Sequence, residues 1–269
     1  MNSSSERGGI FPDKTAENAF AECVVMERLT VLFLAWILMS GNIFVHAAEP
    51  CRTRNLDYGQ KAAGWTHVPL SKFKKDTEYT LTRADAPAVL RGAAVSSASL
   101  YVTRFQPAME VPARITWKWK TDALVSGADN RDKEREDAPL RVLVGFDGDH
   151  AALPDIEKKR FRRAKMLSGR DLPYAVLMYI WSEQVPVDTV IPSAHTGQIK
   201  MLVAAAGSEG LGQWQTIRRN LAEDYRKAFG VDPGPVTGVA VMTDTDNTRT
   251  SAVGEYADIV MECPERGAN

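Results

Sequence analysis

The usual signatures of a specialised protein are missing from this sequence. Its 269 residues include only three cysteines and four histidines, and their net charge is −1. A charge so close to zero excludes a general electrostatic attraction to nucleic acid. The motifs G-x-S-x-G, H-E-x-x-H and C-x-x-C and the phosphate-binding P-loop are absent, so the sequence offers little support for catalysis. With 44% hydrophobic and 25% charged residues, the composition is that of an ordinary globular domain, which excludes disorder, collagen and a multi-span membrane protein.

The longest apolar stretch lies near the N-terminus, at residues 29–45, and its strongest block covers residues 31–39. A membrane-spanning helix needs about 20 apolar residues, so this block is short for a span. Arg28 precedes it and the small residues Ala47 and Ala48 follow it, which is the pattern of a secretory signal peptide cleaved after Ala47. An uncleaved N-terminal anchor is the alternative.

The segment before this stretch does not fit a signal peptide. Residues 1–25 are polar and unpatterned, whereas Met26 would make a conventional start. We therefore predict that residues 1–25 are a non-native extension, that residues 26–47 are the signal peptide, and that residues 48–269 form a single domain. The predicted location is periplasmic or secreted, with no stable membrane span after cleavage.

Removal of the signal peptide would leave 222 residues with 30 basic and 29 acidic side chains and two cysteines, Cys51 and Cys263. In an oxidising compartment an even pair of cysteines suggests a disulfide. Two unpaired terminal thiols are the alternative, and the sequence leaves the choice open. The wide separation of the two residues lacks the ligand spacing of a zinc site.

Strand patterns dominate the mature chain. Residues 115–120 alternate strictly, which places Ile115, Trp117 and Trp119 on one face, where we expect them to pack in a core. Other apolar or alternating runs predict further strands at residues 79–82, 99–102, 141–146, 175–181, 199–206, 236–243 and 256–261.

Helical signals are confined to two segments. Asn220 and Glu223 form a capping-box pattern at the start of one, and Gly230 is a stop signal at its end. The other is the highly charged segment at residues 155–167. Many short strands and few helices predict a mainly β protein, a jelly-roll-like β-sandwich with one or two short helices packed outside it.

Several runs in this order resemble the bacterial domain-of-unknown-function family numbered 3047. They are WKWK at 117–120, DAPLRV at 137–142, YIWS at 179–182, LGQW at 211–214, DYRKAFG at 224–230 and MTDTDNT at 242–248. The resemblance implies a small exported bacterial domain with no established activity. The chain departs from the family pattern at residues 191–195, where it has IPSAH. The order of elements is also similar to galactose-binding-like jelly rolls, which are mostly carbohydrate-binding modules.

The run TDTDNT at residues 243–248 is the most distinctive polar segment. Asp244 and Asp246 alternate at the predicted end of a strand, and Asn247 adds a neutral oxygen. Hard cations such as calcium prefer oxygen ligands of this kind, so Asp244 and Asp246 are candidate metal ligands. A turn stabilised by its own side chains is the alternative reading.

Four further residues are candidates for contact with a ligand. Asp137 and Arg141 flank a predicted strand start, where an arginine and a carboxylate can hold a polar ligand or bridge two loops. Trp181 and Trp214 lie beside polar residues and could stack on a sugar ring, with core or rim packing as the alternative.

Residues 157–170 carry seven basic side chains and one acidic one. A basic helix of this kind can lie on an anionic membrane or on a polyanionic polymer. A solvated surface helix is the alternative.

Together these features predict an exported, non-catalytic domain that binds a polar ligand, with an envelope saccharide as the expected class. Calcium is the one cofactor weighed, and nucleic acid is not an expected partner. The residues expected to converge on one concave face are Asp137, Arg141, Trp181, Asp244, Asp246 and Asn247, with Trp214 as a further ligand contact. The alternatives are a glycan-active hydrolase or lyase that uses a carboxylate pair, and a structural envelope protein with only protein partners.

Overall fold

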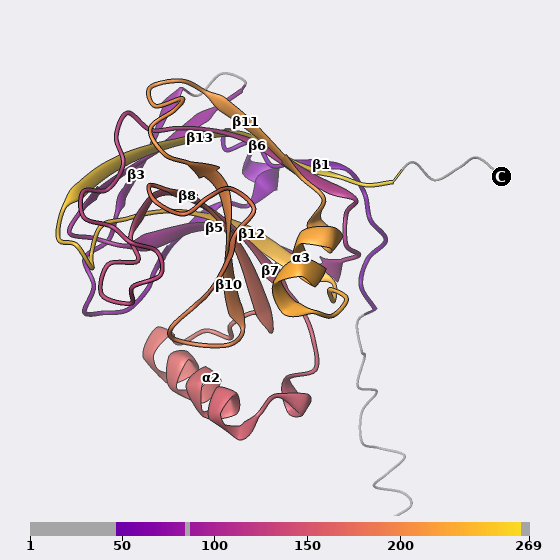
Figure 1. Cartoon of the computed structure of the whole chain (residues 1–269). Helices are drawn as coiled ribbons and strands as arrows, with labels where there is room; N and C mark the ends of the chain where they lie inside the picture. The colour runs from indigo at the N-terminus through magenta and orange to yellow at the C-terminus, as the bar shows by residue number, and fades with distance from the viewer. Residues whose placement is uncertain (1–46, 84–86, 265–269) are drawn as a thin grey trace, which may run out of the picture. The chain divides into compact units, whose positions relative to one another are not determined.

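The alternating and two-sided apolar runs of the sequence form two β-sheets that pack on a common core (Figure 1). The computed structural model describes residues 47–83 and 87–264. The predicted extension at 1–25 and the predicted signal peptide up to residue 46 lie outside the described residues. The described residues from Ala47 onwards belong to one compact unit.

The six-stranded sheet has the order β11-β6-β13-β4-β3, and β1 pairs with β13 beside this path. The pairs described in this sheet are antiparallel. Its strands are β1 (Arg54–Asn55), β3 (Glu78–Arg83), β4 (Val89–Val95), β6 (Arg114–Lys120), β11 (Gln215–Arg219) and β13 (Ser251–Glu262).

The seven-stranded sheet has the order β2-β5-β12-β7-β8-β10-β9. Strands β8 and β10 are parallel, and the other described pairs are antiparallel. Its strands are β2 (Thr66–Pro69), β5 (Ser99–Met109), β7 (Ala138–Phe146), β8 (Ala175–Ser182), β9 (Val190–Pro192), β10 (Ile199–Ala206) and β12 (Val236–Asp244).

Large aromatic side chains fill the core between the two sheets. Trp117 and Trp119 of β6 are fully buried, as the alternation in their strand predicts. The Trp117 ring lies 5.0 Å from that of Tyr179 on β8, and the Trp119 ring lies 6.2 Å from that of Trp181. Because each ring buries a large apolar area, these contacts account for much of the hydrophobic stabilisation that holds the sheets together. The mainly β, sandwich-like architecture predicted from the sequence is confirmed.

The outer face of the seven-stranded sheet carries a second apolar cluster. Along β7, Val142 and Val144 belong to the core between the sheets, whereas Leu143 belongs to the outer cluster, as the two-residue period of a strand requires. Its buried members are Ala98, Leu143, Met178, Ile180, Val185, Ile191, Met201, Val203, Ala240 and Met242. This outer face carries the candidate site.

Helix α3 (Leu221–Phe229) closes one part of the core. The Asn220 side chain accepts a hydrogen bond from the Glu223 backbone N–H at 3.3 Å, which is the N-cap predicted from the sequence. Gly230 ends the helix in a left-handed conformation with φ of 77°, where a side chain would be strained. Tyr225 of α3 is buried in the core between the sheets.

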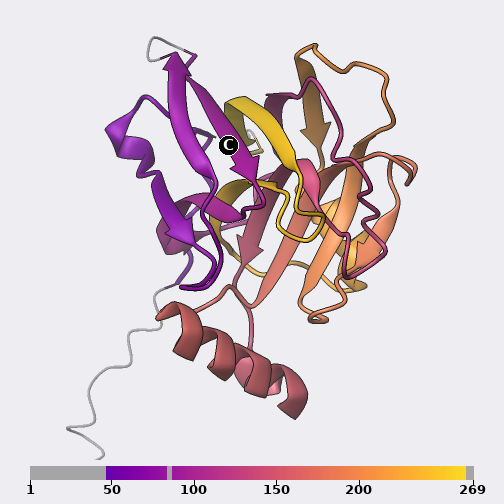
Figure 2. The ribbon, with the colours of Figure 1, turned by 90° about the vertical axis from the view of Figure 1, so that its left-hand side faces the viewer.

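Helix α2 (Asp155–Ser168) follows the short 3₁₀ helix at His150–Ala152 and lies below the strand layers in both views (Figures 1 and 2). The Glu157 carboxylate is buried and accepts hydrogen bonds from the Thr196 hydroxyl at 2.6 Å and the Gly197 N–H at 3.2 Å. These bonds attach α2 to the connection between β9 and β10. Among the described residues, no helix is long and apolar enough to cross a membrane.

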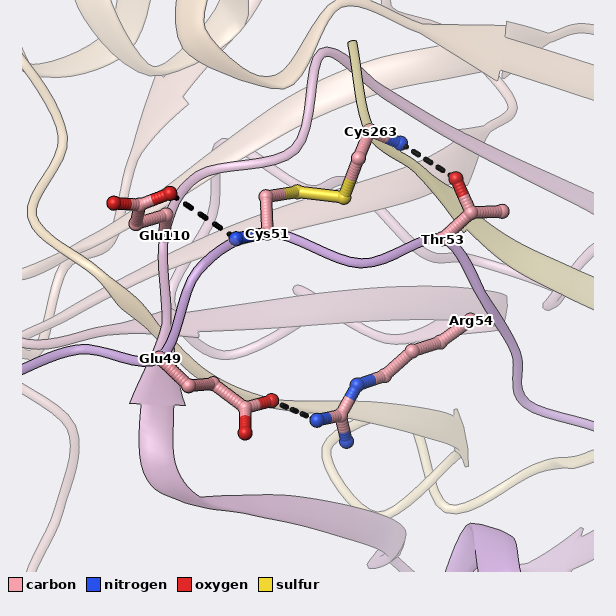
Figure 3. Close-up of a disulfide and its surroundings, with 6 residues drawn as sticks. All are labelled: Glu49, Cys51, Thr53, Arg54, Glu110 and Cys263. Carbon is pink, nitrogen blue, oxygen red and sulfur yellow. Dashed lines mark hydrogen bonds and ion pairs between the residues drawn. A yellow bond between two sulfur atoms is a disulfide. The ribbon is translucent and has the colours of Figure 1, made fainter. Parts of the chain in front are cut away.

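The two ends of the described chain meet at a disulfide between Cys51 and Cys263 (Figure 3). Their Cα atoms are 5.7 Å apart, although 212 positions separate them in the sequence. The Cys51 N–H donates to the Glu110 carboxylate at 3.1 Å, and the Cys263 N–H donates to the Thr53 hydroxyl at 3.0 Å. The disulfide therefore closes nearly the whole domain into one loop.

We expect the Cys51→Ser/Cys263→Ser double variant to lose about 3–5 kcal/mol of unfolding free energy, because an open chain gains more entropy on unfolding. Urea unfolding of the wild type with and without dithiothreitol, and of the double variant, measures this loss. The reductant should destabilise the wild type by the same amount and leave the variant unchanged. Equal stability of all samples would contradict a stabilising role for the disulfide.

Candidate functional site

A buried ion pair lies on the outer face of the seven-stranded sheet, where β7 begins and β12 ends. Arg141 of β7 is 2% exposed, and Asp244, the last residue of β12, is 5% exposed. The Arg141 Nε donates to Asp244 Oδ1 at 3.0 Å. Because β7 and β12 are antiparallel neighbours, the start of one strand and the end of the other meet at the same edge of the sheet.

Further contacts satisfy the two buried charges. The Arg141 Nη1 lies 2.9 Å from the sulfur of Met178, and its Nη2 donates to the Glu136 backbone carbonyl. Asp244 Oδ1 also accepts the Ala138 N–H at 2.8 Å. A buried ion pair is tolerated only when such additional bonds offset the loss of hydration, so the position of each group is tightly constrained.

Burial raises the pKa of the Asp244 carboxyl to about 6. The positive charge of Arg141 acts against this rise, and the negative charge of Asp137 adds to it. A carboxyl with a pKa near 6 changes its charge at mildly acidic pH, where an ordinary aspartate stays ionised. Perturbed carboxyls of this kind are concentrated at functional sites.

Asp137 holds the turn that follows β12. Its Oδ1 accepts the Asn247 N–H at 3.2 Å, and its Oδ2 accepts both the N–H and the hydroxyl of Thr248 at 2.7 and 2.6 Å. The Asn247 side chain donates to the Lys133 carbonyl at 2.9 Å. The loop before β7 and the turn after β12 are therefore fixed to each other.

Asp244 lines a pocket of about 540 Å³, which we call the Asp244 pocket. Its lining contains acids, bases, neutral polar groups and two apolar side chains. The lining residues are Leu70, Ser71, Lys74, Lys133, Glu134, Glu136, His195, Met242, Asp244, Asp246 and Asn247. Inside it, Lys74 forms an ion pair with Asp246, and the His195 Nε2 lies 3.4 Å from a carboxylate oxygen of Glu136. A pocket of this size fits a small ligand.

Three carboxylates come close enough to share a cation. One oxygen from each of Asp137, Asp244 and Asp246 lies within 4.8 Å of the other two. Each is already compensated, however, because Arg141 pairs with Asp244, Lys74 pairs with Asp246, and backbone N–H groups bind Asp137. A divalent ion would compete with built-in cations at this position.

The structure brings together five of the residues that the sequence analysis singled out. Asp137 and Arg141, from the start of β7, meet Asp244, Asp246 and Asn247 from the end of β12. Three of them, Asp244, Asp246 and Asn247, line the pocket directly. Asp137 and Arg141 do not line the pocket; they are buried and hold the residues that do line it through hydrogen bonds.

The expectation that Trp181 converges with these residues is wrong, and Trp214, the further predicted ligand contact, lies on a different part of the domain. Trp181 is 1% exposed, since the two-residue period of β8 turns it into the core, where its Nε1 donates to the Gly207 carbonyl at 2.9 Å. Trp214 is 41% exposed but precedes β11 of the other sheet, with the Lys120 ammonium 5.5 Å from its ring centre. Neither residue lines the Asp244 pocket.

Sequence reasoning missed five charged or titratable residues of the pocket, Lys74, Lys133, Glu134, Glu136 and His195. Lys133, Glu134 and Glu136 belong to the charged run at residues 129–137, whose local pattern does not distinguish a binding residue from a solvated one. Lys74 and His195 lie in loops far along the chain from residues 244–247, and no local pattern marks them. Only the adjacency of Glu136 to Asp137 offered a signal.

Comparison with known proteins identifies the family. The family model described as "Protein of unknown function (DUF3047)" matches residues 63–260, so the chain belongs to this family, as its motifs indicated. The match includes all the lining residues of the Asp244 pocket and neither cysteine of the disulfide.

A search of curated proteins finds no match to the chain. Among solved structures, the chain is similar to the xyloglucanase domain of NopAA, a type three effector from Sinorhizobium fredii, in complex with cellobiose. The sequence identity is 7% and the TM-score is 0.35, over 72% of this chain and 96% of that chain.

We expect Asp137→Asn to lower the unfolding free energy by about 2–3 kcal/mol. Oδ1 of Asp137 accepts from Asn247 and Oδ2 accepts from Thr248, whereas an asparagine amide has an acceptor at only one of its two terminal atoms. Asp132→Asn is the matched control, since Asp132 lies in the same loop and its side chain is 40% exposed. Urea unfolding of both variants measures the difference. Equal effects of the two substitutions would mean that Asp137 does not fix the turn.

The raised pKa of Asp244 predicts a pH dependence of stability. Between an ordinary carboxyl pKa and about 6, the folded chain keeps a proton that the unfolded chain has released, so the unfolding free energy falls as pH rises through this window. We expect the wild type to lose about 2 kcal/mol between pH 4.5 and pH 7 relative to Asp244→Asn, which has no such proton. Urea unfolding of both proteins across this range tests the difference. Parallel curves would show that Asp244 titrates normally.

Proposed function

We propose that this domain is an exported, non-catalytic module that binds a saccharide in the Asp244 pocket. The observation that carries the proposal is the pocket itself, a space of about 540 Å³ that is lined by residues with carboxylate, ammonium, imidazole, amide and hydroxyl groups. A ligand that both donates and accepts many hydrogen bonds suits such a lining. Each hydroxyl group of a sugar ring has this property.

The mixture of groups favours a sugar over a simple ion. The carboxylates of Glu136 and Asp246 can accept bonds from hydroxyl groups, and the ammonium of Lys133 can donate to hydroxyl or ring oxygens. Leu70 and Met242 add a small apolar surface against which the C–H face of a ring can pack. The described residues that line the pocket include no tryptophan, tyrosine or phenylalanine, so hydrogen bonds rather than ring stacking would carry the affinity.

The buried residues below the pocket support binding by preorganisation. Arg141 and Asp137 fix Asp244 and the 245–248 turn before a ligand arrives. Groups that are already held in place lose little conformational entropy on binding, which favours affinity.

We further propose a periplasmic or secreted location and an optional calcium ion. The disulfide between Cys51 and Cys263 supports an oxidising compartment, as does the signal-like segment at residues 26–47. Calcium would bind the oxygens of Asp244 and Asp246 and could bridge to sugar hydroxyls. Because the Asp244 proton competes with an ion, this contribution would strengthen as pH rises through about 6 and level off above it.

A glycan array followed by calorimetry on the strongest oligosaccharide tests the proposal, with 2 mM calcium chloride or with EGTA in parallel. We expect binding that Asp246→Asn weakens about tenfold or more, because one charge-assisted hydrogen bond of this kind is worth about 1.5–3 kcal/mol. Asp258→Asn is the control, since Asp258 forms its ion pair with Lys118 on the six-stranded sheet.

The outcomes separate the elements of the proposal. Binding with calcium and none with EGTA would assign a direct role to the ion, and equal binding in both would remove calcium from the site. No binding to any glycan in either condition would contradict the saccharide proposal. Equal losses in Asp246→Asn and Asp258→Asn would place the binding site away from the pocket.

A glycan-cleaving enzyme is the second candidate, favoured by the closeness of the carboxylates. Asp244, with a pKa of about 6, could donate a proton to a leaving oxygen, and Asp246 has an oxygen within 4.8 Å of it. The glycans that bind in the array would then release new reducing ends on incubation with the protein. Unchanged glycans after prolonged incubation would exclude this reaction for them.

A further inference from the structure

The face of α2 that points away from the β-sheets is cationic and unpartnered. Lys159, Arg162 and Arg163 are exposed, and none has a hydrogen-bond or ion-pair partner within the described ranges 47–83 and 87–264. Their positions, three and four residues apart, place them on one side of the helix. Ile156 and Met166 continue this side, and they are 57% and 77% exposed. We call these five residues the cationic face of α2.

Three other basic residues of α2 form ion pairs with acidic side chains of the same chain. Lys158 lies 4.0 Å from Asp155, and Arg160 pairs with the buried Glu157. Lys165 lies 2.7 Å from Asp171 just beyond the helix. The uncompensated positive charge is therefore concentrated on the cationic face.

The opposite side of α2 fixes the helix to the domain. Glu157 is bound by Thr196 and Gly197, and the Phe161 ring lies 5.2 Å from that of His150. With this inner side anchored, the cationic face cannot turn inward without breaking the Glu157 bonds. In both ribbon views α2 lies clear of the strand layers (Figures 1 and 2).

We propose that the cationic face of α2 docks the protein on a bilayer that contains anionic phospholipids. The three free cations complement the charge of the headgroups, and Ile156 and Met166 are placed on the same side to enter the boundary between headgroups and acyl chains. A soluble polyanion would attract the cations but would offer no apolar environment for the two apolar side chains. The apolar residues are what favours a lipid surface.

Vesicle co-sedimentation tests this surface on the chain as isolated from cells, with equimolar phosphatidylglycerol and phosphatidylcholine against phosphatidylcholine alone. Each Lys or Arg near an anionic bilayer contributes about a fivefold gain in affinity. We therefore expect Lys159→Gln/Arg162→Gln/Arg163→Gln to weaken binding to the anionic vesicles by about 100-fold. Glutamine keeps the helix propensity close to that of lysine and arginine, so α2 should stay folded.

Two further variants make the result specific. Lys61→Gln/Arg218→Gln/Lys227→Gln removes the same charge from exposed positions on other elements, and we expect it to bind within about twofold of the wild type. Ile156→Gln/Met166→Gln keeps every charge and should weaken binding to the anionic vesicles about tenfold. Any part of residues 29–45 that the isolated chain retains is the same in every sample, so the phosphatidylcholine vesicles measure its contribution.

Wild-type binding that does not depend on phosphatidylglycerol would overturn the proposal. So would equal losses in the two triple variants, because the effect would then follow net charge rather than α2. A third outcome has two parts: the apolar double variant binds anionic vesicles as the wild type does, and soluble heparin loses affinity only for the α2 triple variant. Together these results would mean that the surface recognises a polyanion, and the lipid assignment would be wrong.

Discussion

A guanidinium group can be buried on the face of a β-sheet only if an anion and further acceptors replace its lost hydration, and Arg141 is buried in this way. Asp244 supplies the anion, and the carbonyl of Glu136 supplies a further acceptor. These bonds require that the start of β7, the end of β12 and the loop before β7 hold fixed relative positions. The shape of the Asp244 pocket therefore depends on one charged contact, with Asp137 fixing the neighbouring turn beside it.

The connection between β9 and β10 links the pocket to α2. His195 lines the Asp244 pocket, and the next two residues, Thr196 and Gly197, bind the buried Glu157 of α2. The segment at residues 195–197 therefore contacts both the Asp244 pocket and α2, the helix that carries the cationic face.

Strong local patterns predicted much of the fold. The two-sided apolar runs of β7, β8, β10 and β12 and the strict alternation of β6 appear as strands close to the predicted bounds. Four short strands were not predicted, namely β1, β2, β9 and β11. They carry polar residues or lie at sheet edges, where burial imposes little hydrophobic pattern on the sequence. Strand β4 escaped although it is not at an edge, since a glycine and an arginine interrupt its apolar residues.

The sequence by itself determined the strand periodicity, the Asn220 cap, the family and the segments at 137–141 and 244–247 that carry the polar groups, because each depends on neighbours within a few residues. Only the tertiary structure decided that these two segments meet, that Trp181 faces the core, and that Cys51 lies beside Cys263. Lys74 and His195 joined the site in the same way. Such pairings depend on which strands become neighbours, and the order of strands is set by burying the common core rather than by any local residue pattern.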